Sequence, residues 1–325
     1  MKSSRGFTLV ELMIVLAIMG IITPVLVVLL TSITKGFTGY EAAMSMRKIN
    51  QQSLNRMYMR LGSCKRIFEN STNDSTYLNK VAFNSSPAAI SIIKLPTINR
   101  DGSLAAGTTN FDATGVGNAI LFATNEMVQA MSSSTFRIDV YRFNYYYLTS
   151  ANTSVIDSGS SYKLVEWRSA AYADNNQLNN LSTSSRTVVA TQLYNAGIKY
   201  AWDPTKTTIT GALSTITNVG GISTDASPTI KEYKYKVLTD MITGVVIGGY
   251  RYGVSRNSSD WAKAPKIVPL FTTANGTFPG GFEVAVAGSS AGRQVLIRSV
   301  LVAQGSMKAI IGDDLQVVAS ARDLW

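Results

Sequence analysis

An apolar stretch near the amino-terminal end, residues 7–30, constrains this chain more than any other feature. It contains one charged residue, Glu11, and follows two basic residues, Lys2 and Arg5. About 20 apolar residues are enough to cross a bilayer as a helix. Because positive residues tend to stay on the cytoplasmic side, residues 1–6 should lie in the cytoplasm. The rest of the chain beyond the apolar stretch should then be exported.

The position of the Glu11 carboxylate within an apolar stretch is energetically unfavourable and requires an explanation. A charged group at this depth costs roughly 2.5–3.5 kcal/mol on insertion scales. An ordinary secretory signal would end its apolar core at a small-residue cleavage site. Here the feature that resembles a cleavage site, Arg5-Gly6 before Phe7, lies on the cytoplasmic side of the apolar core. Cleavage at this point would leave the hydrophobic helix on the mature protein.

Residues 5–20, RGFTLVELMIVLAIMG, resemble the class III leader of type IV pilins and type II secretion pseudopilins. The resemblance implies that a prepilin peptidase cuts after Gly6 and N-methylates Phe7. It also implies two further partners, which are other pilin or pseudopilin subunits contacted through the N-terminal helix and the inner-membrane assembly platform. The implied location is a single pass through the cytoplasmic membrane with the globular domain exported, followed by a pilus or a periplasmic pseudopilus.

Cleavage would create a partner for Glu11. The freed α-amino group of Phe7 is a cation at the membrane edge, and a buried carboxylate is tolerable when it meets an opposite charge. The amine of its own chain and the amine of a neighbouring subunit are both possible partners. The resemblance implies the second, with Glu11 aligning the incoming subunit.

Pro24 should break the ideal helix, because proline lacks a backbone donor and frees the carbonyl of Gly20. Membrane helices tolerate such breaks when hydroxyls or neighbouring groups satisfy the freed atoms. Two outcomes remain open. One is a simple kink, and the other is the melting near a proline that the resemblance to pilins implies within a filament.

The helix should continue beyond the apolar stretch. Between residues 40 and 68 the apolar residues recur mostly at steps of three and four, which is the spacing of an amphipathic helix. We therefore expect one long helix over residues 7–69, with 7–30 transmembrane and 31–69 amphipathic, and with Cys64 as a small buried apolar residue. The basic residues in its second half should form a solvated face; they are Arg47, Lys48, Arg56, Arg60, Lys65 and Arg66.

Residues 70–325 should form one large β-rich globular domain, so the expected fold class is α+β. Short runs of β-branched and aromatic residues recur between Gly, Pro, Asn and Ser clusters, which is typical of strands and turns. The alternation in residues 141–145 favours a strand with one buried face. The expected strands are 89–95, 119–123, 136–149, 162–168, 187–202, 231–238, 245–254, 282–287 and 294–303.

The order of the expected strands carries a second, weaker resemblance. Segments 138–143, 162–168 and 187–200 are similar in order to those of PilW-type minor pilins and J-type minor pseudopilins. In those proteins a hairpin ending in a basic residue precedes an apolar segment and then an aromatic strand. Length agrees with this interpretation, since a main pilin is usually much shorter than 325 residues.

Charge limits the choice of partners only loosely. Charged residues are 15% of the chain, and the formal net charge is +10. Such an excess could favour nucleic acid, anionic lipid or an acidic partner, or it could only aid solubility. The one short basic and aromatic run in the β-rich region, residues 231–236, is explained equally well by strand alternation, so nucleic acid is a weakly supported partner.

Catalysis finds little support in the sequence. The chain has no histidine, which excludes Ser-His-Asp and Cys-His arrangements and histidine-bound zinc. Four carboxylates of the β-rich region stand apart in sequence, namely Glu126, Glu166, Glu232 and Glu283. We expect no catalytic residue, no metal site and no cofactor.

Three functions follow in order of preference. The first is a minor type IV pilin or pseudopilin, a structural subunit that joins or primes a filament. The second is a filament-displayed binding subunit, either an adhesin or a DNA-uptake protein. The third is a membrane-tethered enzyme, which the missing catalytic residues disfavour.

Overall fold

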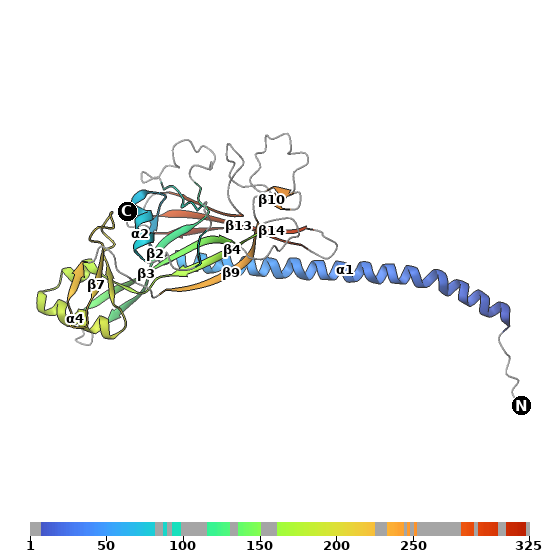
Figure 1. Cartoon of the computed structure of the whole chain (residues 1–325), viewed down its shortest axis with the longest axis horizontal. Helices are drawn as coiled ribbons and strands as arrows, with labels where there is room; N and C mark the ends of the chain where they lie inside the picture. Colours follow the sequence, from blue (N-terminus) through green and yellow to red (C-terminus); the bar gives the residue numbers. More distant parts are fainter. Residues whose placement is uncertain are drawn as a thin grey trace, which may run out of the picture.

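The structure is a computed structural model in which one long helix projects from a β-rich head (Figure 1). The residues it describes are 8–81, 87–89, 93–98, 116–130, 136–150, 161–224, 233–243, 246–247, 250–251, 281–288, 292–304 and 310–322. The expected α+β fold, with a long N-terminal apolar helix followed by a large β-sheet domain, is confirmed.

The helices are α1 (Leu9–Leu61), α2 (Thr72–Lys80), α3 (Asn175–Asn179) and α4 (Thr183–Asn195). The first strands are β1 (Cys64–Phe68), β2 (Ile120–Ala130), β3 (Arg137–Ser150), β4 (Ser161–Arg168), β5 (Tyr172–Asp174), β6 (Tyr200–Trp202), β7 (Leu213–Ile216) and β8 (Ile222–Thr224). The remaining strands are β9 (Lys234–Thr243), β10 (Val246–Ile247), β11 (Tyr250–Arg251), β12 (Phe282–Ala287), β13 (Arg293–Gln304) and β14 (Ile310–Ala321).

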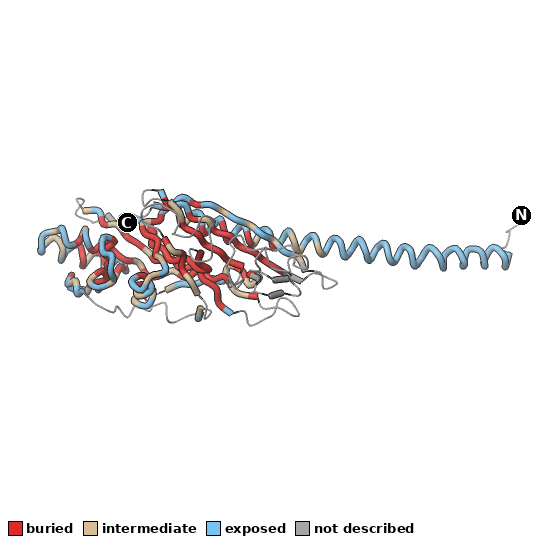
Figure 2. Tube along the Cα trace, turned by 90° about the horizontal axis from the view of Figure 1, so that it is seen from above, coloured by how far each residue is buried: buried red, intermediate tan, exposed pale blue. Residues whose placement is uncertain are grey.

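Helix α1 has 53 residues, so it is about 80 Å long at 1.5 Å per residue. Its two halves differ in their surroundings. Residues 8–38 are all exposed, and Figure 2 shows this part of the helix standing clear of the head. The second half is amphipathic, and its buried residues recur at helical spacing; they are Met46, Asn50, Ser53, Leu54, Met57 and Leu61.

The helix ends at Leu61, not at Glu69 as the sequence analysis expected. Gly62 caps the helix, and Cys64–Phe68 then pairs with β2 as strand β1. Successive residues of this strand are buried, because Ile67 and Phe68 face different cores on the two sides of the sheet. Cys64 is buried, as expected, although it lies on a strand.

The head is built on one twelve-stranded sheet, counted over the described residues. Its path runs β12-β13-β9-β4-β3-β5-β6-β7-β8, with β14 beside β13 and with β1 and β2 beside β3. The pairings are antiparallel except for β5 with β6, which is parallel. Strand β9 connects the part of the sheet that holds β12, β13 and β14 to the rest. It pairs with β4 along most of its length and meets β13 only at Ile242 and Leu301.

Strand β3 is buried on both faces, which corrects the expectation of one buried face. Tyr146 and Leu148 belong to the core that α1 covers. Phe143 and Tyr145 belong to a second, aromatic core on the other face. In that core the ring of Phe143 lies 5.0 Å from the ring of Trp202, between centroids.

Segment 187–202 is mostly helix, so the strand expected there was wrong. Ser182 caps the helix α4 by accepting a bond from the backbone N–H of Ser185. Its buried residues, Val189, Ala190 and Leu193, fall on one helical face and pack on a small third core with Ile138 and Val140 of β3. Only the aromatic end of the segment, Tyr200–Trp202, is a strand.

The other expected strands have mixed outcomes. Those at 136–149, 162–168, 282–287 and 294–303 correspond to β3, β4, β12 and β13. No strand occupies the described residues 87–89 and 93–98, and most of 245–254 lies outside the described residues apart from the short β10 and β11. Helix α2 and strand β14 were not expected.

Candidate assembly site on the projecting helix

The first turn of α1 is closed by Thr8 and Glu11. The backbone N–H and the hydroxyl of Thr8 both donate to Glu11 Oε2, at 2.9 and 3.0 Å. The backbone N–H of Glu11 in turn donates to Thr8 Oγ1 at 3.3 Å. This reciprocal pair is a capping box, which satisfies donors that every helix N-terminus leaves unpaired.

Glu11 is therefore held by its own helix in the single chain. Both contacts fall on Oε2, so Oε1 accepts no hydrogen bond from the described residues. One oxygen orients the carboxylate while the other can meet a cation. Gly6 and Phe7, the expected cleavage and methylation residues, lie outside the described residues, so the choice of amine that pairs with Glu11 stays open.

Thr8 is the residue that the sequence analysis missed here. The spacing Thr-x-x-Glu before an apolar run is the sequence signature of a capping box. That signal was available in residues 8–11. Its meaning was obscured because the same residues also match the leader motif.

Threonine hydroxyls in and just after the apolar part of α1 are hydrogen-bonded within the helix. The hydroxyls of Thr23, Thr31 and Thr34 donate to carbonyl oxygens four residues earlier, at 2.7–2.8 Å. Such bonds matter in lipid, where no water is available to replace them. Residues 9–30 span about 33 Å at 1.5 Å per residue, which exceeds the roughly 30 Å of a bilayer core.

Pro24 lies within α1, and the helix continues through it. The bond from Thr23 to the carbonyl of Met19 at 2.7 Å lies next to the position where proline removes a donor. Figure 1 shows the projecting helix curving gently without interruption. The helix therefore does not end at Pro24 in the single chain, and both the simple kink and the melting inside a filament stay predictions.

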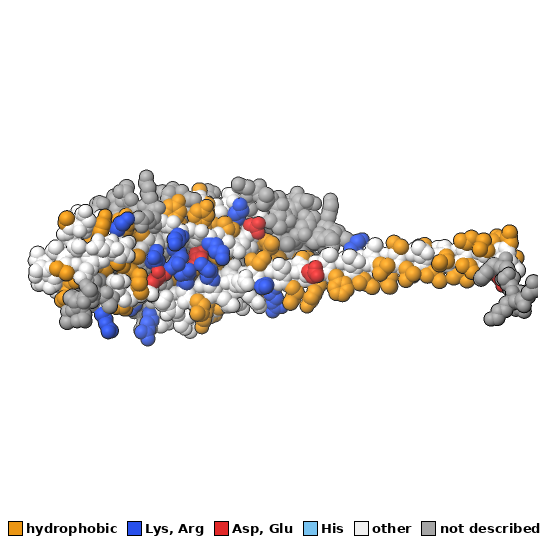
Figure 3. Space-filling model, turned by 90° about the horizontal axis from the view of Figure 1, so that it is seen from below, with side chains coloured by type: hydrophobic (Ala, Val, Ile, Leu, Met, Phe, Trp, Pro, Cys, Tyr) orange, Lys and Arg blue, Asp and Glu red, His pale blue; other side chains and the backbone are white. Residues whose placement is uncertain are grey.

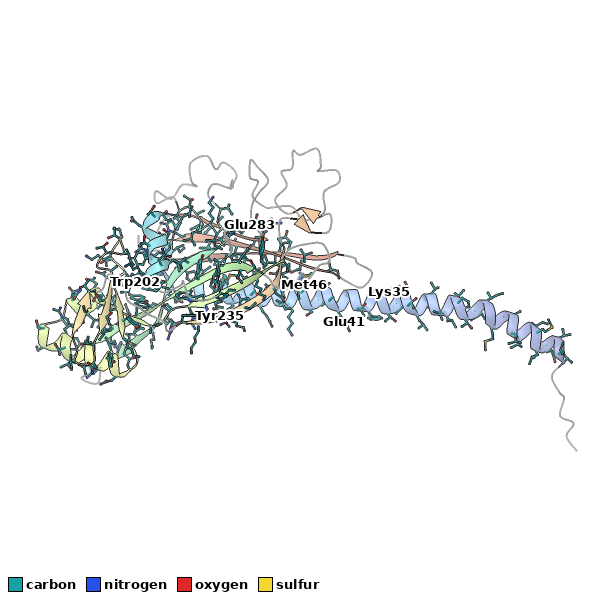
Figure 4. The ribbon with its side chains drawn as sticks, viewed as in Figure 1. Lys35, Glu41, Met46, Trp202, Tyr235 and Glu283 are labelled. Carbon is teal, nitrogen blue, oxygen red and sulfur yellow. The ribbon has the colours of Figure 1, made fainter. Side chains whose placement is uncertain are left out.

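Apolar packing and ion pairs hold the second half of α1 against the head. Met46 marks the place where the helix meets the head, while Lys35 and Glu41 lie on the projecting part (Figure 4). Farther along, the guanidinium groups of Arg56 and Arg60 donate to the two oxygens of Glu166, at 2.5 and 2.6 Å. Two of the residues expected on a solvated face therefore anchor the helix.

Arg66 is a second correction to the expected solvated face. It is buried, and its guanidinium donates to Asp74 at 3.1 Å and to the carbonyl of Lys206 at 2.7 Å. It also lies over the rings of Phe68 and Tyr77. Strand β1, helix α2 and the loop after β6 are joined through this one side chain.

Residues 1–23 match the family model described as the prokaryotic N-terminal methylation motif. No curated protein and no solved structure matches the chain. The match covers the leader and the first turns of α1, and it is consistent with a type IV pilin-like prepilin leader. It supports a pilin-like or pseudopilin-like precursor that is anchored in a membrane before assembly.

Proposed function

We propose that this chain is the precursor of a filament subunit, and specifically of a minor type IV pilin or minor pseudopilin. A prepilin peptidase removes residues 1–6 by cutting after Gly6 and methylates Phe7. Residues 7–30 hold the subunit in the cytoplasmic membrane with its head exported. The assembly platform then moves it into a filament, where α1 packs against the same helix of other subunits. This role is structural, not enzymatic.

The observation that carries the proposal is the exposed first half of α1. Most of its side chains are apolar, and none of residues 8–38 is covered by the head. Burying one such side chain contributes about 1.5–3 kcal/mol, so the helix needs lipid or other helices around it. The leader motif at residues 1–23 supports a protein that uses both surroundings in turn.

A minor subunit is favoured by the size of the head and by its strand order. Strands β3 and β4 form the antiparallel pair that ends at Arg168, and the aromatic strand β6 follows helix α4, which has one apolar buried face. This keeps the order of hairpin, apolar segment and aromatic strand on which the resemblance to PilW-type and J-type subunits rests.

Replacing Glu11 tests the proposal. Glu11→Ala should leave cleavage after Gly6 intact but lower incorporation into filaments by about tenfold or more, because a charged hydrogen bond contributes about 1.5–3 kcal/mol. Immunoblots of sheared filaments and of membranes measure both steps. Glu41→Ala is the matched control, because Glu41 is an exposed carboxylate farther along the same helix. Equal incorporation of the two variants would contradict the role given to Glu11.

A further inference from the structure

Four arginines surround two glutamates where α1 ends on the sheet. Arg56 and Arg60 come from α1, and Glu126, Arg142, Glu166 and Arg168 come from strands β2, β3 and β4. We call these six residues the arginine cluster. Figure 3 shows Lys and Arg side chains gathered around carboxylates on this side of the head.

Both carboxylates are paired with arginines of the cluster. Glu166 is 2% exposed and accepts from Arg56, Arg60 and the hydroxyl of Tyr146. Glu126 accepts from Arg142 at 2.6 Å, pairs with Arg168, and lies 3.9 Å from Arg60. A bulge in β2 between Asn125 and Met127 directs Glu126 into the cluster, as bulges commonly do for one side chain.

Positive charge remains in excess after this pairing. Four guanidinium groups share two carboxylates, so two cations of the cluster have no counter-charge within it. Burial, together with repulsion from Arg60 and Arg56, lowers the pKa of Arg168 to about 10. Its Nε is buried and donates to no acceptor in the described part of the chain.

The neighbouring strand adds to the excess. Lys236 and Lys234 of β9 lie opposite Glu166 and Arg168 of β4 in the register. Residues opposite one another in a β ladder share a face of the sheet. Both lysines are exposed, so they extend the positive surface beyond the cluster.

Exposed apolar side chains adjoin the cluster in sequence. On α1, Met59 lies next to Arg60 in sequence and has an exposed fraction of 74%. On β2, Met127 and Val128 follow Glu126 and are also exposed. Methionine and arginine are among the residues enriched in protein–protein interfaces.

We propose that the arginine cluster docks a carboxylate-bearing segment of another protein chain. A guanidinium fork suits carboxylate and phosphate geometry alike, but the apolar neighbours favour a protein partner over a nucleic-acid backbone. Such backbones are held mainly by charged and polar contacts to phosphate. A carboxylate from the partner supplies the negative charge that the cluster lacks. The proposal does not depend on membership of a filament.

Binding of a labelled glutamate-alanine repeat peptide to the full chain in detergent tests this docking, with fluorescence anisotropy as the measurement. A glutamine-alanine repeat and a short DNA duplex serve as comparison probes. We expect the acidic peptide to bind more tightly than either. Arg56→Gln should weaken its binding about fivefold, on the scale of a partly exposed ion pair, while Arg60 continues to hold Glu166. Arg47→Gln, an exposed arginine on the same helix, is the matched control and should have no effect.

A second variant separates docking from a purely internal role. Glu126→Gln removes a carboxylate from the cluster, so it should tighten peptide binding about threefold or more, even though the internal ion pairs of Glu126 with Arg142 and Arg168 are lost. An internal network alone gives no reason for tighter binding. Equal effects of Arg56→Gln and Arg47→Gln, no binding of the acidic peptide, or a preference for the duplex would each overturn the proposal. Filament incorporation is measured separately, so these outcomes leave the proposed function untouched.

Discussion

At the scale of single residues, the carboxylate of Glu166 does most to join the helix to the head. It is buried on β4, yet it receives both arginines from α1, which are 106 and 110 residues away in sequence. The tyrosine that completes its shell comes from β3. Three elements therefore depend on one side chain.

Glu166→Gln should destabilise the head by about 2 kcal/mol. Breaking a buried ion pair costs about 3–5 kcal/mol, and the value is smaller here because Arg56 is 40% exposed and can turn to water. Urea unfolding followed by the fluorescence of the buried tryptophans Trp167 and Trp202 measures the change. Glu41→Gln, on the projecting helix, should have no effect, and a loss below about 0.5 kcal/mol for Glu166→Gln would contradict this account.

Some site residues could be predicted from the sequence, and others could not. The depth of Glu11 in an apolar run identified it as a site residue, because a charge in lipid needs a partner wherever it occurs. The arginine cluster gave no such signal. Arg56 and Arg60 have the spacing of an ordinary solvated helix face, and their partner Glu166 is placed by strand pairing that no local pattern encodes.

At the scale of elements, the region of α4 and the turn before β8 shows how tightly the far end of the head is packed. Gly220 has a φ of 78°, and a Cβ built on it would lie 2.3 Å from the carbonyl oxygen of Thr187. Only a residue without a side chain lets the turn approach α4 so closely. Gly197, which follows the C-cap of α4, has a similar φ of 85° but nothing within 4 Å of such a Cβ.

These two glycines form a matched pair for a stability test. Gly197→Ala should cost only the strain of the left-handed conformation, about 1–2 kcal/mol. Gly220→Ala should cost at least about 2 kcal/mol more, because the carbonyl of Thr187 is backbone and must shift. Thermal unfolding of the two variants compares the costs, and equal losses would show that the turn does not press on α4.

The errors in element assignment have a common cause. Segment 187–202 contains β-branched residues that favour strands, but its cap at Ser182 and its burial at Val189, Ala190 and Leu193 belong to a helix. Helix α1 ends early because Ile67 and Phe68 are required in two cores of the sheet. In both places long-range packing decided between local preferences, which are weak.

At the scale of the whole molecule, the chain combines two different parts. The head has its own buried hydrophobic cores, whereas the apolar first half of α1 is exposed. Strand β3 separates two cores, α1 covers one of them, and the apolar half of α1 reaches beyond the head. The sequence allowed this division to be predicted, because an apolar run and a β-rich remainder differ plainly in pattern. It did not allow prediction of the strand order, which brings β13 beside β9 across a long stretch of chain.

The mature N-terminus tests the proposed processing at the leader most directly. Mass spectrometry of the protein recovered from sheared filaments should find a chain that begins at Phe7 and carries one added methyl group on its amine. In Gly6→Val, a branched side chain fills the space that glycine leaves for the peptidase, so that variant should begin at Met1 and remain in the membrane. A wild-type chain that begins at Met1 and is missing from filaments would contradict the account.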